Sequence, residues 1–215
     1  TVSGGKVLES QTVVIASGAS ALYLGIESEQ KLMNRGVSAC ATCDGALYRN
    51  QPVAVVGGGD SAMEESLFLS RLCSKVTLIH RRDAFRASKI MADRVKSNRK
   101  IEIRWNSVVE AVMDVAKNEV TGLKLRNVKT GEIFTISVNA VFMAIGHSPN
   151  TAAFAGQLKL DEKGFIIASD SRTSVEGVFA AGDVQDPRYK QAVTAAGTGC
   201  VAALEVERYL AGIGS

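Results

Sequence analysis

The sequence has no long apolar run, few cysteines and little net charge, and each of these absences excludes a class of protein. No stretch approaches the roughly 20 apolar residues that a membrane-spanning helix needs. Four cysteines in 215 residues are too few for a disulfide scaffold. A formal net charge of +3 is too small to indicate a nucleic-acid partner. We therefore expect an ordinary globular protein that binds neither a membrane nor nucleic acid.

The N-terminal segment lacks the signals that direct a chain out of the cell. Residues 1–5 have neither the basic region nor the apolar region of a signal peptide. We therefore expect a reducing compartment, the cytoplasm, with an organelle stroma or matrix as the alternative. The chain also lacks an initiator Met, which is typical of a piece of a longer protein.

The cysteines divide into one informative pair and two others. Cys73 and Cys200 lie in apolar stretches, and we expect both to be buried. Cys40 and Cys43 form a C-x-x-C motif, which is compatible with half of a zinc site, an inert core pair or a redox disulfide. Zinc would require a second pair of ligands, but no second C-x-x-C exists and the two histidines are isolated. We therefore predict no metal site.

Polar and turn-forming residues around the motif favour the redox interpretation. Thr42, Asp44 and Gly45 surround the two cysteines, which disfavours an inert core pair. Thiol–disulfide exchange needs a proton at the leaving sulfur, and the Asp44 carboxyl could supply it. Asp44 could also be a plain turn residue or a helix N-cap.

A glycine-rich turn follows a strand-like apolar run at 53–57 and precedes a helical segment from Ala62 to about Leu72. A second apolar run, 76–79, completes a βαβ unit. The turn fits G-x-G-x-x-A, in which glycines allow a tight bend and the approach of a pyrophosphate to a helix N-terminus. Its residues are Gly57, Gly58, Gly59, Asp60, Ser61 and Ala62.

The end of the second strand indicates which dinucleotide binds. An NAD site has an acidic residue there, about 20 residues after the turn, for the ribose 2′-hydroxyl. This chain instead has His80, Arg81 and Arg82, with Arg86 one turn later. Guanidinium groups pair with a 2′-phosphate, so the cluster favours NADPH, although a solvated basic surface is the alternative.

The remaining patterns predict an α/β fold. A helical segment follows Ser88, and residues 101–145 predict strands that form a three-stranded antiparallel layer before returning to the main parallel sheet at Val141. We expect strands at 6–9, 12–16 and 177–180 and a helix from Gln191 to about Leu210. The first two strands have no preceding unit with which to pair. The other expected strands are 101–105, 108–115, 121–127, 133–138 and 141–145.

Taken together, these motifs resemble the low-molecular-weight, bacterial and plant type of NADPH-dependent thioredoxin reductase. The resemblance extends over essentially all 215 residues, and its motifs occur in the family's order. The matching segments are 36–45, 57–62, 80–83 with Arg86, 144–150 (AIGHSPN) and 173–183 (TSVEGVFAAGD).

The resemblance implies a homodimeric FAD enzyme with two Rossmann-like domains. Electrons would pass from NADPH to FAD, then to the Cys40–Cys43 disulfide and finally to thioredoxin. By analogy, Cys43 faces the flavin, Asp44 handles the proton and Cys40 exchanges with thioredoxin. Asp183 matches the aspartate that bonds the flavin's ribityl chain, unless it is an ordinary turn aspartate. The other implied cofactor contacts are Ile145, Gly146, Gly182, Lys190, Gln191 and Ala192.

The sequence departs from the family at its start. The family opens with a G-x-G-x-x-G unit for FAD, but residues 1–52 contain no strand–glycine–helix unit. We therefore expect an NADPH-binding domain at 22–145 and a partial FAD-binding Rossmann-like domain, formed by 1–21 and 146–215. Two alternatives to a thioredoxin reductase remain: a non-catalytic NADPH-binding module, and a related flavoprotein disulfide reductase that serves another dithiol protein.

Overall fold

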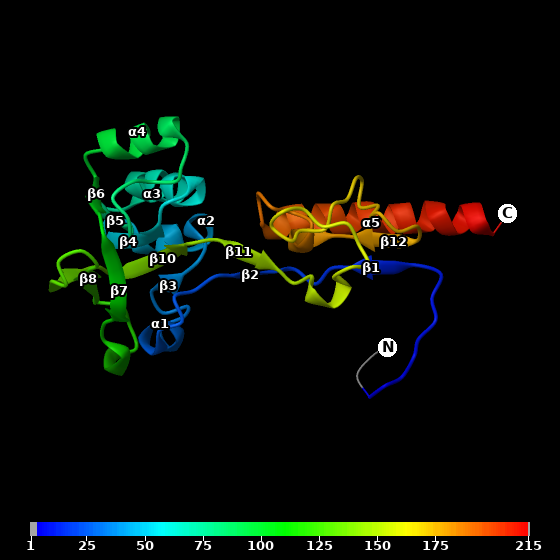
Figure 1. Ribbon diagram of the computed structural model, residues 1–215, viewed down its shortest axis with the longest axis horizontal. Helices are drawn as coiled ribbons and strands as arrows, with labels where there is room; N and C mark the ends of the chain where they lie inside the picture. Colours follow the sequence, from blue (N-terminus) through cyan, green and yellow to red (C-terminus); the bar gives the residue numbers. More distant parts are fainter. Residues whose placement is uncertain (1–3, 215) are drawn as a thin grey trace. The chain divides into compact units, whose positions relative to one another are not determined.

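The computed structural model describes residues 4–214 and divides the chain into two compact units (Figure 1). The terminal unit is formed by residues up to Ser20 and from His147 onward, and the middle unit is Ala21–Gly146. The sequence placed these boundaries at 21/22 and 145/146, and the structure divides the chain at 20/21 and 146/147. Strands β2 and β11, which pair with each other, lie where the chain passes from one unit to the other. They span Ala19–Ala21 and His147–Pro149.

A five-stranded parallel sheet forms the centre of the middle unit, which confirms the predicted fold class. Its strand order is β3-β10-β4-β5-β6, so β10 lies between β3 and β4 although it comes last in the sequence. All residues of β4 and β5 except the first of each strand are buried, because both faces of the sheet are covered. The bounds are Val37–Ser38 for β3, Pro52–Gly57 for β4, Lys75–Ile79 for β5, Ile101–Arg104 for β6 and Ala140–Ala144 for β10.

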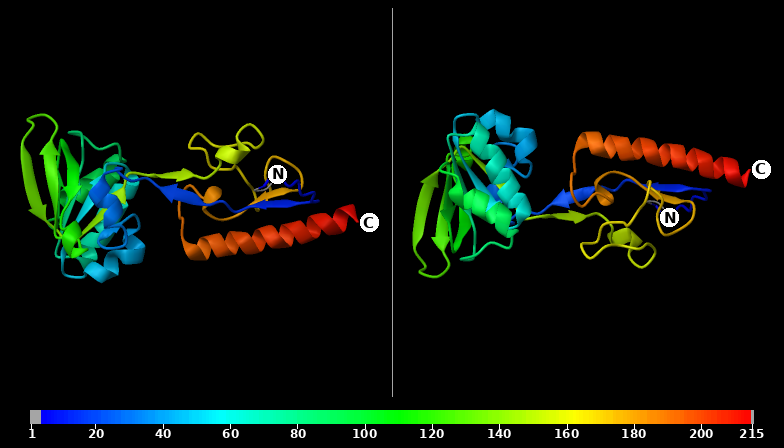
Figure 2. Two further views of the ribbon diagram at one scale, coloured as in Figure 1. Left: turned by 90° about the horizontal axis from the view of Figure 1, so that it is seen from below. Right: turned by 90° about the horizontal axis from the view of Figure 1, so that it is seen from above.

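Alternate residues of β4 belong to two separate apolar cores. Val53 and Val55 pack with helices α3 and α4 on one face of the sheet. Ala54 and Val56 pack against the antiparallel layer on the other face. The period of two along a strand produces this division, and Figure 2 shows the two layers on opposite sides of the sheet. Helix α3 spans Asp60–Leu72 and α4 spans Lys89–Ser97.

The antiparallel layer is a meander of three strands, as the sequence predicts. Strand β8 pairs with both β7 and β9, and a register shift between Val109 and Ala111 marks a bulge in β7. Helix α1 lies beside this layer, where the Ser28 hydroxyl accepts the Val112 N–H at 2.9 Å. The bounds are Glu27–Lys31 for α1, Ser107–Val112 for β7, Gly122–Asn127 for β8 and Ile133–Ser137 for β9.

The terminal unit is smaller and has a simpler core. Strand β1 (Val13–Ile15) pairs in parallel with β12 (Val178–Ala180). The long helix α5 (Ala192–Ile213) lies along β12, as both views of Figure 2 show, and packs Ala202 against Phe179. Short 3₁₀ turns complete the fold: η1 Gly45–Tyr48, η2 Val115–Lys117, η3 Ala152–Phe154 and η4 Gly182–Val184.

Three expectations from the sequence are wrong. Residues 6–9 form no strand; Val7 and Leu8 are largely exposed, and no neighbouring strand in the described chain pairs with them. The strand expected to reach Val115 ends at Val112, because Asp114 adopts a left-handed backbone with φ 72°. Cys200 is exposed rather than buried, because about 200° of helical rotation separates it from Ala202 on the packed face of α5. Cys73 is buried, as expected.

Candidate functional site

Four neighbouring strands of the central sheet end at one edge, and each end carries part of the predicted site. In a parallel sheet all carboxyl ends lie at the same edge, and ligands bind there where the strand order reverses. Here β4 leads on to β5 and β6 on one side, whereas β10 and β3 lie on the other, so the reversal falls between β4 and β10. The dithiol follows β3, Ile145 follows β10, the glycine turn follows β4, and His80 with the arginines follows β5.

The two cysteines form a disulfide in a single turn of helix. Helix α2 spans Ala41–Asp44, and the Cys40 and Cys43 sulfurs are bonded, with their Cα atoms 5.3 Å apart. The Cys40 sulfur accepts the Cys43 N–H at 3.2 Å, so it lies at the N-terminus of the turn. A thiolate formed there would keep this hydrogen bond, which lowers the cost of its charge. Cys43 is exposed and Cys40 half-buried, so the disulfide is accessible to a partner.

Ser38 links the disulfide to Asp44. Its hydroxyl donates to Asp44 Oδ2 at 2.6 Å and accepts the Cys40 N–H at 3.1 Å. The carboxyl group is therefore held beside the cysteine loop rather than turned into solvent. Sequence reasoning did not assign Ser38 a role, although a hydroxyl residue two positions before Cys40 is a signal for a local side-chain to backbone bond.

The three glycines of the turn differ in what surrounds them. A Cβ on Gly57 would lie 2.4 Å from the Ala144 carbonyl oxygen, so this glycine lets β4 approach the end of β10. A Cβ on Gly58 would lie 2.1 Å from the His80 ring, so this glycine makes room for His80. At Gly59 no non-neighbouring heavy atom of residues 4–214 lies within 4 Å of a Cβ position, which leaves the start of α3 open to a ligand.

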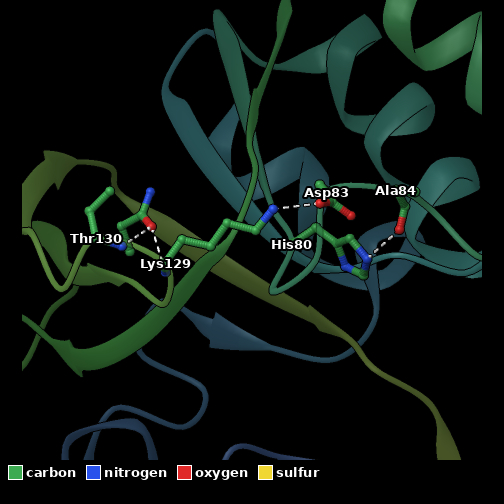
Figure 3. Close-up of polar contacts among 6 residues, drawn as sticks. His80, Asp83, Ala84, Lys129 and Thr130 are labelled. Atoms are coloured by element: carbon green, nitrogen blue, oxygen red, sulfur yellow. Dashed lines mark hydrogen bonds and ion pairs between the residues drawn. The ribbon is translucent and has the colours of Figure 1, made fainter.

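His80 is a buried residue that supports the glycine turn and the loop after β5. Its Nε2–H donates to the Ala84 carbonyl at 3.0 Å, as Figure 3 shows. Its ring also packs beside Phe85 and Trp105, with centroids 5.5 and 6.1 Å away. Burial lowers the pKa of His80, an effect that the hydrogen bond to Ala84 partly opposes. We therefore expect His80 to be neutral and to act through its shape.

The basic residues lie around one cavity of the middle unit. Arg81, Arg82 and Arg86 line a cavity of about 270 Å³ together with Gly57 and Gly58. His80 and Ile145 line it too, whereas Gly146 and the remaining residues of the turn do not.

The other turn residues hold the frame of this cavity. Ala62 is fully buried beneath Gly57, and the exposed Ser61 lies in the first turn of α3. Asp60 Oδ1 accepts both the N–H and the hydroxyl of Ser88, each at 2.9 Å. Asp60 therefore ties the start of α3 to the start of α4.

The predicted flavin residues belong to the terminal unit. Gly182 and Asp183 lie in η4 directly after β12, and the Gly182 N–H donates to the Thr198 hydroxyl of α5 at 2.9 Å. Lys190, Gln191 and Ala192 lead into α5, where Gln191 and Thr194 form a reciprocal capping box.

His147 lies near these residues, although sequence reasoning gave it no role. Burial lowers the pKa of His147, and the Lys190 ammonium lowers it further. Burial also lowers the pKa of Lys190, which the Asp186 and Asp183 carboxylates partly offset. The position of His147 directly after Gly146 in the AIGHSPN segment was the available signal.

The two predicted cofactors fit the residues present to different extents. The cavity with three arginines beside an open helix N-terminus suits the phosphates of a nicotinamide dinucleotide. Asp183 Oδ1 is buried with no hydrogen-bond partner in the described part of the chain, so it could accept a hydroxyl of a flavin side chain. No second glycine turn is present for the other half of a dinucleotide.

Neither a metal site nor a membrane-spanning helix is found within residues 4–214. No group of three His, Cys, Asp or Glu side chains there is placed to hold a metal ion. No helix of this region has the length and apolar character needed to cross a bilayer.

Comparison with known proteins gives one family match over most of the chain and relatives of high identity. The family described as pyridine nucleotide-disulphide oxidoreductase matches residues 1–199. The thioredoxin reductase of Rickettsia conorii is 54% identical over 209 residues, which are 96% of this chain and 67% of that protein. Thioredoxin reductase 2 of Arabidopsis thaliana is 54% identical over 219 residues, which are 98% of this chain and 57% of that protein.

Solved structures give the same result. The crystal structure of thioredoxin reductase from Streptococcus pyogenes matches with a TM-score of 0.88 and 42% identity, over 94% of this chain and 66% of that one. Thioredoxin reductase from Giardia duodenalis matches with a TM-score of 0.87 and 44% identity, over 93% and 66% of the two chains. The chain thus spans about two thirds of the length of its bacterial relatives.

Proposed function

Because this chain belongs to the pyridine nucleotide-disulphide oxidoreductase family, and within it to the thioredoxin reductases, we propose that it is a thioredoxin-disulfide reductase. It would pass electrons from NADPH through FAD to the Cys40–Cys43 disulfide and on to thioredoxin. The main support for the proposal is that the dithiol and the glycine turn lie at the same edge of the parallel sheet. Strand order places the dithiol after β3 and the glycine turn after β4, with only β10 between them.

The middle unit would hold NADPH. The open start of α3 at Gly59 offers its N–H groups to the pyrophosphate, and the arginines of the cavity offer paired donors to the 2′-phosphate. The terminal unit would hold the flavin end of FAD. Asp183 would accept a hydrogen bond from the ribityl chain, and Lys190, Gln191 and Ala192 would offer the flavin the partial positive charge at the start of α5. Bound FAD would supply a two-electron relay between a hydride donor and a disulfide.

The residues of α2 would carry out the exchange with thioredoxin. Once Cys40 and Cys43 are reduced, the Cys40 thiolate, stabilised by the Cys43 N–H, attacks one sulfur of the partner disulfide and the other sulfur leaves. Cys43 then attacks Cys40, which restores the intramolecular disulfide and releases the partner with two thiols. Asp44, whose carboxylate accepts the Ser38 hydroxyl, would move the proton that a departing sulfur needs.

NADPH consumption by the full chain, with FAD and oxidised thioredoxin supplied, tests the proposal. We expect NADPH-dependent formation of thioredoxin thiols, and we expect Cys40→Ser to abolish it while NADPH binding stays unchanged. Cys200→Ser, which removes an exposed cysteine outside the C-x-x-C motif, is the matched control and should be fully active.

The alternatives make different predictions in the same assay. NADPH binding without flavin binding or thiol formation would support a non-catalytic module. Reduction of another dithiol protein but not of thioredoxin would support a related disulfide reductase. The homodimer and the cytoplasmic location stay predictions.

A further inference from the structure

We propose that Lys129 is a positioning residue that sets the preference of the cofactor cavity for a 2′-phosphate, by holding the Asp83 carboxylate away from the arginines. The proposal rests on the function proposed above and concerns the same cavity. It assigns a role in cofactor selection to the turn between β8 and β9, far from the cavity in sequence.

Asp83 is the single carboxylate of the basic loop, residues 80–88. It follows Arg82 directly and precedes Arg86 by three positions, so its charge opposes an anion that those arginines would bind. It pairs instead with the Lys129 ammonium, with Nζ and Oδ2 2.6 Å apart, and no ion pair within residues 4–214 joins it to an arginine. The bond to Lys129 lowers the pKa of Asp83, so the carboxylate is charged at neutral pH.

The turn that carries Lys129 is itself fixed. The side-chain oxygen of Asn127 accepts the N–H groups of Lys129 and Thr130 at 2.9 and 3.1 Å. The Lys129 side chain then extends from this turn across to Asp83, as Figure 3 shows. The Lys129 side chain is long and flexible, but these two bonds fix the backbone from which it extends.

Backbone bonds tie this turn to the basic loop. The Val128 N–H donates to the Asn106 carbonyl at 2.7 Å, and the Asn106 N–H donates to the Arg82 carbonyl at 3.1 Å. The antiparallel layer and the basic loop are therefore connected at the backbone, independently of the ion pair. Loss of the Lys129 ammonium would change the charge around Asp83 without releasing the turn.

The basic loop is also held on the side of the glycine turn. The N–H groups of Arg86 and Ala87 both donate to the Gly58 carbonyl, at 2.8 and 3.2 Å. With His80 bonded to Ala84, the loop backbone has a fixed path. The mobile element is the Asp83 side chain, which would turn toward the nearest guanidinium groups if Lys129 were absent and would compete there with a phosphate.

The exposure of the two side chains sets how strongly the loss of Lys129 should change nucleotide affinity. The Lys129 and Asp83 side chains are 59% and 67% exposed, so solvent screens their interaction and its effect on binding should be small. We expect a loss of affinity of about two- to fivefold. The loss should shrink as salt concentration rises, because exposed charges are screened.

The test compares nucleotides with and without the 2′-phosphate on the full chain. Adenosine 2′,5′-bisphosphate and adenosine 5′-monophosphate are titrated, and the fluorescence of the single tryptophan, Trp105, reports binding. Trp105 suits this purpose because the centroid of its ring lies 4.3 Å from that of Phe85, which belongs to the basic loop. Calorimetry provides an independent measurement.

Four variants separate the possible roles of Lys129. We expect Lys129→Ala to weaken the bisphosphate about two- to fivefold and to leave the monophosphate unchanged. Asp83→Asn should bind the bisphosphate at least as well as the wild type, and the double variant should regain wild-type affinity. Lys117→Ala removes a lysine, also paired with an aspartate, at the opposite end of β8, and should change neither affinity.

Each contrary result has a distinct meaning. If the double variant is as weak as Lys129→Ala, Lys129 acts directly on the phosphate and the proposal is wrong. Equal weakening of both nucleotides would show a structural role and would also overturn it, as would an unchanged affinity. If the wild type itself fails to distinguish the two nucleotides, the proposed NADPH site fails, which is a separate outcome from failure at Lys129.

Discussion

Glu65 shows how one side chain makes the stability of the middle unit depend on pH. It lies on α3, its Oε2 atom is buried without a hydrogen-bond partner in the described chain, and burial raises its pKa to about 8. Burial is the larger cause of this shift, and the neighbouring Glu64 carboxylate is the smaller one. A carboxyl group with this pKa is protonated in the folded protein at neutral pH but ionised in the unfolded chain, where its pKa is near 4.5.

The sign of the pH dependence follows from these protonation states. Between about pH 4.5 and 8 the folded protein binds more protons than the unfolded chain, so the free energy of unfolding falls as pH rises. We expect Glu65→Gln to flatten this slope and to stabilise the protein at pH 8. The gain should be on the order of a few kcal/mol, since a tenfold change in proton affinity is worth about 1.4 kcal/mol.

Urea unfolding at several pH values, with Trp105 fluorescence as the signal, measures this effect. The exposed Glu64 supplies a control, because Glu64→Gln removes the smaller cause and should keep most of the slope. Identical slopes for the wild type and Glu65→Gln would show that Glu65 is ionised in the folded protein.

Residue types in a motif were predictable from the sequence, whereas their partners were not. The C-x-x-C motif and its neighbouring acid are visible because they are adjacent in the chain. The bond from Ser38 to Asp44, by contrast, depends on how α2 turns after β3. The exposure of Cys200 depends on which face of α5 packs on β12. Both are properties of three-dimensional packing, which local patterns do not contain.

At the scale of elements, the β4–α3 turn combines a packing requirement with a binding surface. Gly58 is required by the protein itself, because His80 fills the space of its missing side chain. Gly59 has extended backbone dihedrals, φ −97° and ψ −178°, which any residue adopts, and its surroundings are open. The two neighbouring glycines therefore serve different purposes.

Alanine substitutions should separate these purposes. We expect Gly58→Ala to lower the thermal midpoint and to weaken NADPH binding, since the new methyl group collides with the buried His80 ring. Gly59→Ala should leave the midpoint within a few degrees and weaken NADPH binding about tenfold or more, because the methyl group lies where a pyrophosphate approaches. Thermal unfolding and nucleotide titration measure the two effects. Unchanged binding by Gly59→Ala would show that the phosphates do not lie over this residue.

Strong periodicity made most elements of the middle unit predictable. The expected strands 53–57 and 76–79 correspond to β4 (Pro52–Gly57) and β5 (Lys75–Ile79). Pairing order was not predictable, since nothing in the apolar run 141–145 states that it lies between β3 and β4. Short elements such as α2 and β3 were missed because two to four residues carry no period, and they exist through tertiary contacts.

At the scale of the whole molecule, the two units differ in how much apolar surface they bury. The middle unit has two large apolar cores, one on each face of its sheet. The terminal unit has two small ones, around Ile15 and Phe179, and α5 leaves Val193 82% exposed and Leu204 47% exposed. Because burial of apolar surface is the main stabilising contribution to folding, the terminal unit should be the less stable of the two.

We therefore expect two unfolding transitions in urea. The first should remove helical signal from α5, whose 22 residues belong to the terminal unit, and leave Trp105 fluorescence unchanged. The second should unfold the central sheet and change that fluorescence. The buried Glu205 carboxylate of α5 pairs with Arg172 and Arg208, both at 2.5 Å. Because all three residues belong to the terminal unit, Glu205→Gln should move only the first transition to lower urea. Val55→Ala, in the core of the middle unit, should move only the second. One transition, with circular dichroism and fluorescence superimposed for the wild type and both variants, would show that the units unfold as one cooperative body despite their unequal cores.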